Sequence, residues 1–82
     1  MTFETVVQTE DEGVFVELPA DSELARARAP VTVTINGVSW ESSVAAYGGR
    51  FYLPLRRSIR DMARIEPGDT VTVTLEGRGG TL

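Results

Sequence analysis

The sequence contains no cysteine, no histidine and no lysine among its 82 residues. Without cysteine there are no disulfide bonds, thiolate nucleophiles or zinc–thiolate sites. Without histidine, neither a Ser-His-Asp nor a Cys-His constellation can form, and the ordinary metal ligands that remain are carboxylates. Without lysine, Schiff-base chemistry is excluded as well. We therefore predict a protein that is not an enzyme and has no cofactor or metal. An enzyme that works with carboxylates alone is the catalytic alternative.

Long apolar runs are also missing. The apolar stretches are far shorter than the roughly 20 residues that a membrane-spanning helix needs. The N-terminal sequence "MTFETVVQTEDEG" has neither the positive charge nor the apolar stretch of a signal peptide. The sequence therefore predicts a cytoplasmic protein that does not contact a membrane.

Positive charge is scarce and unevenly distributed. The chain has 12 acidic residues against 8 basic ones, all arginine, and a net charge of −4. Most of the acidic residues precede residue 30, whereas most of the arginines follow it. The acidic total disfavours nucleic acid as a partner, although a local group of arginines could still bind phosphate.

Alternating valine, threonine and aromatic residues predict a mainly β protein with two short helices, in the order ββαβββαβ. The first two strands are expected at 3–10 and 14–18. A weak helix is expected after Pro19, with Asp21 or Ser22 as its N-cap, and a second helix in "RRSIRDMARI". The last strand is expected in "TVTVTLE".

Two glycine-containing turns predict two hairpins. Asn36-Gly37 favours a two-residue type I′ turn, which sets Ile35 opposite Val38 and Val33 opposite Trp40. All four side chains then face the core, Trp40 included. The Gly48-Gly49 turn gives three further pairs on the same inward face: Ala46–Phe51, Val44–Leu53 and Ser42–Leu55.

The phrase "VTVTING" at 31–37 returns as "VTVTLEG" at 71–77, and in each case a strand, a proline and a helical segment come before it. Residues 13–37 and 49–77 are therefore interpreted as two copies of one unit, with chance recurrence of good strand composition as the alternative. Two such units could bury each other's apolar faces and close a small barrel. We predict one domain over residues 1–77 and a flexible tail at 78–82.

The second predicted helix combines an apolar stripe with a row of arginines. Ile59, Met62 and Ala63 make the stripe. Asp61 is spaced to pair with Arg57 and Arg64, which would neutralise part of the row. Either the row contacts nucleic acid or a partner, or it is simply a solvated helix face. The candidate contact residues are Arg50, Arg56, Arg57, Arg60 and Arg64.

Two other stretches could bind a ligand. In "EPGD", Glu66 and Asp69 are better explained as a turn, with Asp69 accepting hydrogen bonds, than as metal ligands. Tyr47 and Tyr52 fall on the face opposite Trp40 or on the turn. We expect these two tyrosines to form an outward ligand patch, lined also by Arg50.

The stretch "GRFYLPLRRSIRDMARIEPGDTVTV" resembles the swapped-hairpin motif of the AbrB/SpoVT transition regulators and MazE-type antitoxins. Over about residues 3–77, the segments "VFVELPAD", "VTVTINGVSW", "YLPL" and "ARIEPGDTVTVTLE" are similar to the bacterial domain-of-unknown-function family 1905. That resemblance implies an AbrB-like double-split β-barrel, built from two pseudo-symmetric halves of one chain. In AbrB-type proteins arginines near the proline–helix junction contact DNA, and this likeness carries over to Arg50 and Arg60.

The functional prediction is accordingly a small bacterial binding or interaction module with no established activity. Its partner would be an unknown protein or small ligand. The resemblance suggests a YdeI/OmpD-associated protein, because family members are often fused to such a segment. The alternative is a DNA-binding transcriptional regulator that uses the arginine-bearing second helix. A barrel closed by one chain permits a monomer or a weak dimer.

Overall fold

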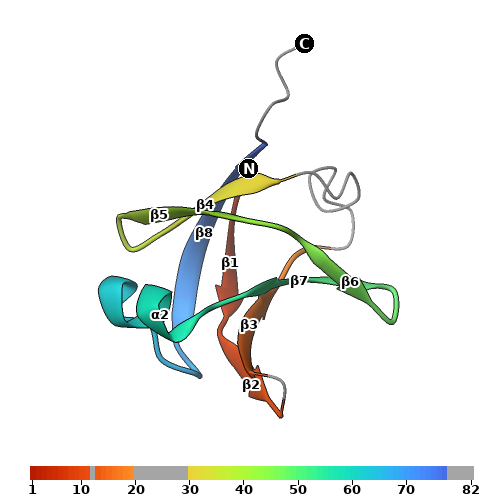
Figure 1. Cartoon of the computed structure of the whole chain (residues 1–82), viewed down its shortest axis with the longest axis horizontal. Coiled ribbons are helices and arrows are strands. Elements are labelled where there is room, and N and C mark those ends of the chain that lie inside the picture. The colour runs from red at the N-terminus through yellow and green to blue at the C-terminus, as the bar shows by residue number, and fades with distance from the viewer. Residues whose placement is uncertain (12, 20–29, 78–82) are drawn as a thin grey trace.

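A computed structural model of the chain describes residues 1–11, 13–19 and 30–77 (Figure 1). Within these ranges the protein is mainly β, with one helix. The helix expected after Pro19 and the expected tail at 78–82 lie outside the described residues. In chain order the elements are β1 (Thr2–Val6), β2 (Gln8–Glu10), β3 (Gly13–Glu17), β4 (Val31–Ile35), β5 (Val38–Ser42), β6 (Ala45–Tyr47), β7 (Arg50–Pro54), α2 (Arg57–Ala63) and β8 (Thr70–Gly77).

The strands form two four-stranded antiparallel sheets. One sheet has the order β1-β8-β4-β5 and the other has the order β2-β3-β7-β6. Among the described residues no ladder joins the two sheets, so the strands do not form one closed barrel. Within the described residues the chain passes directly from one sheet to the other at two points, from β1 into β2 and from β5 into β6 (Figure 1).

Both passages divide a strand that the sequence predicts as continuous. The expected strand at 3–10 breaks at Val7, whose backbone N–H donates to the Asp69 carbonyl (2.8 Å). The Val7 carbonyl in turn accepts from the Gly68 N–H, also at 2.8 Å, so Val7 pairs with a turn rather than with a strand. Beyond β5, residues 43–44 separate it from β6.

The second break corrects two of the predicted hairpin pairs. Val44 is not part of a strand, so Val44–Leu53 is not a ladder pair. Ser42 pairs with Val31 in the other sheet, so it cannot lie opposite Leu55. The alternation of apolar and polar residues alone does not reveal that the chain changes from one sheet to the other at residues 43–44.

The Asn36-Gly37 hairpin is confirmed. Ile35 lies opposite Val38 and Val33 lies opposite Trp40 in the β4–β5 ladder. Asn36 and Gly37 have φ angles of 52° and 80°, as the two positive positions of a type I′ turn require. Trp40 is half-buried and packs against the core rather than lying fully within it. In the second hairpin, the expected Ala46–Phe51 pair is confirmed, but Ala46 is exposed.

The core lies between the two sheets. From β4 and β8, alternate side chains are buried, as expected for strands with one face on the core. Val16 of β3 and Leu53 of β7 lie opposite each other in the second sheet, and both are fully buried. The largest side chains that are almost completely buried are Ile35, Leu53, Leu75, Val7, Val16, Val31, Val33 and Val73.

Equivalent strands of the two predicted repeats are direct neighbours. β3 pairs with β7, and β4 pairs with β8, each in the antiparallel sense. Two equivalent elements related by a two-fold axis meet in this antiparallel way. The outer strands of this sheet are arranged in the same way, because β1 lies next to β8 and β5 lies next to β4.

The helix is shorter than expected. α2 ends at Ala63, and Arg64 has a left-handed conformation (φ 58°) that stops the helix there. Ala63 is buried and Ile59 is half-buried, but Met62 is 64% exposed, so placing Met62 in the apolar stripe was wrong. In the described part of the chain, no helix has the length and apolar character that a membrane crossing requires.

Candidate functional site

The outward face of the β2-β3-β7-β6 sheet is aromatic. Because Val16 and Leu53 face the core, strand alternation turns their neighbours Phe15 and Tyr52 to the other face. The short strand β6 adds Tyr47, which pairs with Arg50 in the β6–β7 ladder and lies on the same face. Three aromatic side chains from three adjacent strands therefore share one surface.

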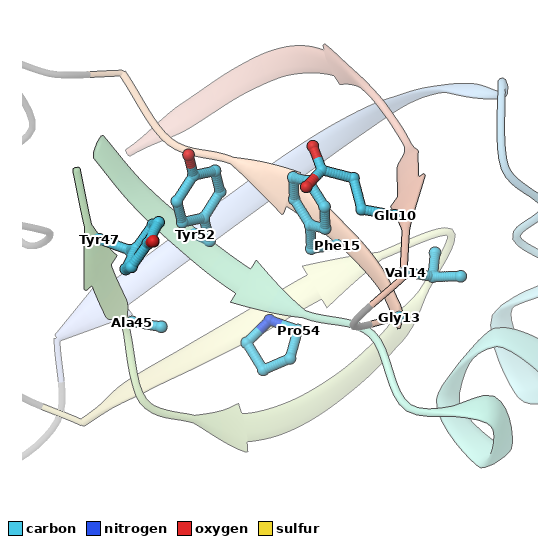
Figure 2. Close-up of a pocket in the computed structure, with 8 residues that line it drawn as sticks. All are labelled: Glu10, Gly13, Val14, Phe15, Ala45, Tyr47, Tyr52 and Pro54. Atoms are coloured by element: carbon cyan, nitrogen blue, oxygen red, sulfur yellow. The ribbon is translucent and has the colours of Figure 1, made fainter. Parts of the chain in front are cut away.

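This face is hollowed into a groove of about 330 Å³. Figure 2 shows the aromatic side chains standing side by side across the sheet, with Pro54 at their base. The two tyrosines that the sequence suggests as a ligand patch both belong to it. The residues that line the groove are Glu10, Gly13, Val14, Phe15, Ala45, Tyr47, Tyr52 and Pro54.

Two of the three aromatic rings contact each other, and the third is exposed. Phe15 and Tyr52 meet edge to face, with ring centroids 5.0 Å apart and an interplanar angle of 84°. That contact fixes two rings against each other in a favoured geometry. Tyr47 is 80% exposed, more than any other large hydrophobic residue in the described part of the chain. A tyrosine this exposed adds little to the core, so its place in the groove is not explained by folding.

The formal charge of the groove lining comes from Glu10. Glu10 ends β2 and pairs with Gly13 across the β2–β3 turn, where Gly13 has a φ of 128° that strongly favours glycine. Its carboxylate end is directed toward the Phe15 side of the groove (Figure 2). Asp11, the next residue, is exposed on the same turn.

Arg50 lies beside the groove but is not among the residues that line it. Its Nε is 3.9 Å from the Oε2 of Glu17, and the two side chains are 66% and 33% exposed. An ion pair this long and this exposed contributes little to stability. It nevertheless directs the guanidinium toward Glu17.

The five candidate arginines do not form one surface. Arg50 begins β7, and the other four follow its far end, beyond roughly 16 Å of strand. Arg60 is half-buried, and its Nε donates to the Leu55 carbonyl (3.1 Å), so part of its guanidinium is used within the fold. The remaining three are exposed: Arg56, Arg57 and Arg64. Among the described residues, Asp61 forms none of the expected ion pairs with its neighbouring arginines.

A second hollow of about 470 Å³ lies between β5 and α2. It is more polar than the groove, and Pro54 lines both. Trp40 contributes its half-buried ring here, next to Arg56 at the start of the helix. The full lining consists of Trp40, Glu41, Ser42, Ser43, Pro54, Arg56, Ser58 and Ile59.

The acidic residues of "EPGD" have a structural role. The Oδ2 of Asp69 accepts from the Glu66 backbone N–H at 2.9 Å, and Gly68 has a φ of 94°. The turn interpretation is therefore confirmed. Across residues 1–11, 13–19 and 30–77, no three acidic side chains are grouped closely enough to hold a metal ion.

One family profile, described as "Domain of unknown function (DUF1905)", matches residues 3–75. The chain belongs to this family. The matched range runs from Phe3 in β1 to Leu75 in β8, so the groove of the DUF1905 domain and its helix both lie within it. No curated protein matches the chain.

Sequence reasoning found Tyr47 and Tyr52 but missed Phe15, Glu10 and Pro54. Phe15 stands between two inward valines, so alternation alone could have placed it on the outer face. The β3–β7 register, which sets Phe15 opposite Pro54, joins segments that are distant in sequence. Nothing in a local pattern specifies that pairing.

Proposed function

We propose that this DUF1905 domain is a binding module and that its ligand occupies the aromatic groove on the outer face of β3, β7 and β6. The observation that supports this most directly is Tyr47, a large aromatic side chain that is 80% exposed at the rim of an apolar hollow. Binding is favoured over catalysis because the sequence has no histidine, cysteine or lysine.

The size of the groove suits a small ligand. Typical small-molecule sites have volumes of about 300–1,000 Å³ and are mostly apolar, with a few polar groups that fix orientation. The groove, at about 330 Å³, is at the lower end of that range. Its aromatic walls and its single carboxylate have the composition of such a site.

The test is a fragment screen followed by amide chemical-shift mapping on the ¹⁵N-labelled domain. We expect ligand-induced shifts to cluster at Ala45, Tyr47 and Tyr52. We expect binding to weaken at least about fivefold in Tyr47→Ala, which corresponds to a loss of about 1 kcal/mol or more for an aromatic contact. Met62→Ala is the matched control, because Met62 is also well exposed but lies on α2. No hits, or shifts that cluster elsewhere, would refute the proposal.

We also propose the finer fold relationship, an AbrB-like double-split barrel made of two equivalent halves. Its support is the antiparallel pairing of β3 with β7 and of β4 with β8. An experimental structure tests it directly. A two-fold rotation should superpose residues 2–35 on residues 39–75 where both are ordered, and a failure to superpose would contradict it.

Nucleic-acid binding by the helix stays the alternative. Arg56, Arg57 and Arg64 are exposed and available to phosphate, but the net charge of −4 opposes a polyanion. A gel shift with mixed genomic fragments at low and moderate salt decides it. Salt-sensitive retardation that is lost in Arg57→Ala would favour this alternative. Absence of retardation at low salt would end it.

A protein partner also stays a prediction. A YdeI/OmpD-associated protein encoded separately is the partner that the family resemblance suggests, and a pull-down tests it. Light scattering tests the predicted monomer or weak dimer. An obligate dimer at micromolar concentration would contradict that prediction.

A further inference from the structure

We infer that the groove selects an organic cation, an ammonium or guanidinium group carried on an apolar body. This inference rests on the proposed function and adds the charge class of the ligand. It follows from three features of the outer face: the carboxylate in the groove lining, the aromatic rings beside it, and the ion pair that keeps Arg50 occupied.

The first feature is the sign of the charge. Glu10 is an exposed lining residue of the groove, and Asp11 adds a second negative charge on the adjacent turn. The other lining residues are uncharged at neutral pH. A ligand that inserts an anionic group here would be repelled, whereas a cation would be attracted.

The second feature is the arrangement of aromatic rings. Phe15, Tyr52 and Tyr47 come from three neighbouring strands, and the first two are held edge to face. A cation placed over an aromatic face is attracted by the negative charge of the ring's π-system, and sites for amine ligands commonly combine several such rings. Figure 2 shows the Glu10 carboxylate beside this row of rings, so one cation could contact both.

The third feature is the position of Arg50. As the partner of Tyr47 in the β6–β7 ladder, it is the cation closest in register to the groove. Its Nε lies 3.9 Å from the Oε2 of Glu17, and Arg50 is not among the residues that line the groove. Arg50 is therefore paired with Glu17 rather than with Glu10. We infer that a positively charged ligand group pairs with the Glu10 carboxylate instead.

Three small molecules with the same aromatic body separate charge from shape. Phenethylamine carries a cation, 2-phenylethanol is neutral and 3-phenylpropionate is an anion. Each is titrated into the ¹⁵N-labelled domain at low salt while the amides of Gly13, Ala45, Tyr47 and Tyr52 are followed. We expect phenethylamine to bind about five- to tenfold more tightly than 2-phenylethanol, with 3-phenylpropionate weakest, from one cation–π contact and one exposed charge pair.

Variants then assign the selectivity to residues. Glu10→Gln should remove most of the preference for the amine and leave the affinity for the alcohol unchanged. Glu76→Gln makes the same change of net charge at an exposed position on β8, outside the groove, and should leave both affinities unchanged. Tyr47→Phe keeps the ring and should preserve binding, whereas Tyr47→Ala should weaken all three ligands.

The outcomes distinguish this inference from the proposal on which it rests. Equal binding of the amine and the alcohol in the groove would overturn the charge class but leave the binding module standing. Preference for 3-phenylpropionate would also overturn the inference. If none of the three probes shifts the groove amides while other fragments do, the cation is again the wrong class. Absence of any ligand in the groove would refute both.

Discussion

Thr34 and Thr74 lie directly opposite each other at one end of the β4–β8 ladder, and each shares a hydroxyl hydrogen bond with the strand on its other side. The Oγ1 of Thr34 is 2.7 Å from the Oγ of Ser39 on β5. The Oγ1 of Thr74 is 3.2 Å from the Oγ1 of Thr2 on β1. One contact is the counterpart of the other under exchange of the two halves of the chain.

This relationship suggests how the predicted repeat extends to the outer strands. If Thr2 corresponds to Ser39, then "TFETVV" at 2–7 corresponds to "SWESSV" at 39–44. The register agrees, since Phe3 lies opposite Val73 and Trp40 lies opposite Val33. Both segments also end in a buried valine, at the point where the chain changes sheets. If the halves are equivalent, as proposed, the repeat includes the outer strands.

A circular permutant tests whether the halves are exchangeable. Met1 is already joined to β8, since the Leu75 N–H donates to the Met1 carbonyl at 2.7 Å. Linking Gly77 to Met1 and opening the chain between Asn36 and Gly37 should give a folded protein, less stable by about 1–2 kcal/mol because one hairpin connection is lost. Thermal melting by circular dichroism and an amide spectrum measure the result.

The control permutant opens the chain between Val16 and Glu17, inside the central β3–β7 pair. It should fail to melt cooperatively, because the break interrupts a buried ladder. If the turn permutant also fails, the two halves are not independent units of the fold.

Asn36 ties the β4–β5 turn to the helix. Its Nδ2 donates to the Ala63 carbonyl (2.8 Å), and its φ is 52°. Asn36→Gly keeps the left-handed backbone but loses the hydrogen bond, so it should lower the free energy of unfolding by about 1 kcal/mol. Asn36→Ala should cost about 2 kcal/mol, because it adds a left-handed alanine.

Urea unfolding followed by Trp40 fluorescence measures both Asn36 variants. The difference between them isolates the backbone conformation from the hydrogen bond. Equal losses would contradict a separate contribution from the turn.

Arg64 ends α2 in a conformation that suits glycine. With φ at 58°, Arg64→Gly removes unfavourable contacts of the side chain, and the gain exceeds the entropy that glycine loses on folding. We expect the free energy of unfolding to rise by about 0.5–1 kcal/mol, seen as a higher melting temperature. The matched control, Met62→Gly, is exposed but helical, and it should lower stability by about 1 kcal/mol.

Leu53 and Tyr47 lie on adjacent strands, but truncation to alanine should lower the free energy of unfolding strongly at Leu53 and hardly at all at Tyr47. Leu53 is fully buried, so Leu53→Ala should lower the free energy of unfolding by about 2–5 kcal/mol. Tyr47 is 80% exposed, so Tyr47→Ala should change stability by less than about 0.5 kcal/mol. Chemical unfolding measures both. A large loss of stability in Tyr47→Ala would make it a structural residue and weaken its place in the groove.

Much of the local structure could be predicted from the sequence, for a simple reason. The Asn36-Gly37 pair specifies its turn through the positive φ angles that asparagine and glycine tolerate, and the turn then sets the register of Val33 and Trp40. Alternation in "TVTVTLE" likewise places Val71, Val73 and Leu75 on one face of the strand, and all three are buried. Both depend on interactions between residues that are close along the chain.

The candidate site could be predicted only in part. Tyr47 and Tyr52 flank one hairpin turn, so their common face follows from local geometry. Phe15 and Glu10 join them because β3 pairs with β7, a contact between segments more than 30 residues apart. The position of the Arg60 side chain could not be predicted either, because its hydrogen bond to the Leu55 carbonyl depends on the path of the chain between β7 and α2.

By itself the sequence determined most strand positions, the Asn36-Gly37 turn and the residue types that are absent, because these depend on composition and short spacings. Only the tertiary structure decided that the strands make two sheets, that Val7 marks a bend, and that a carboxylate stands beside three aromatic rings. The physical reason is that backbone hydrogen bonds between distant strands have no local signature. Many partners satisfy the same alternating pattern, and the shared core selects one.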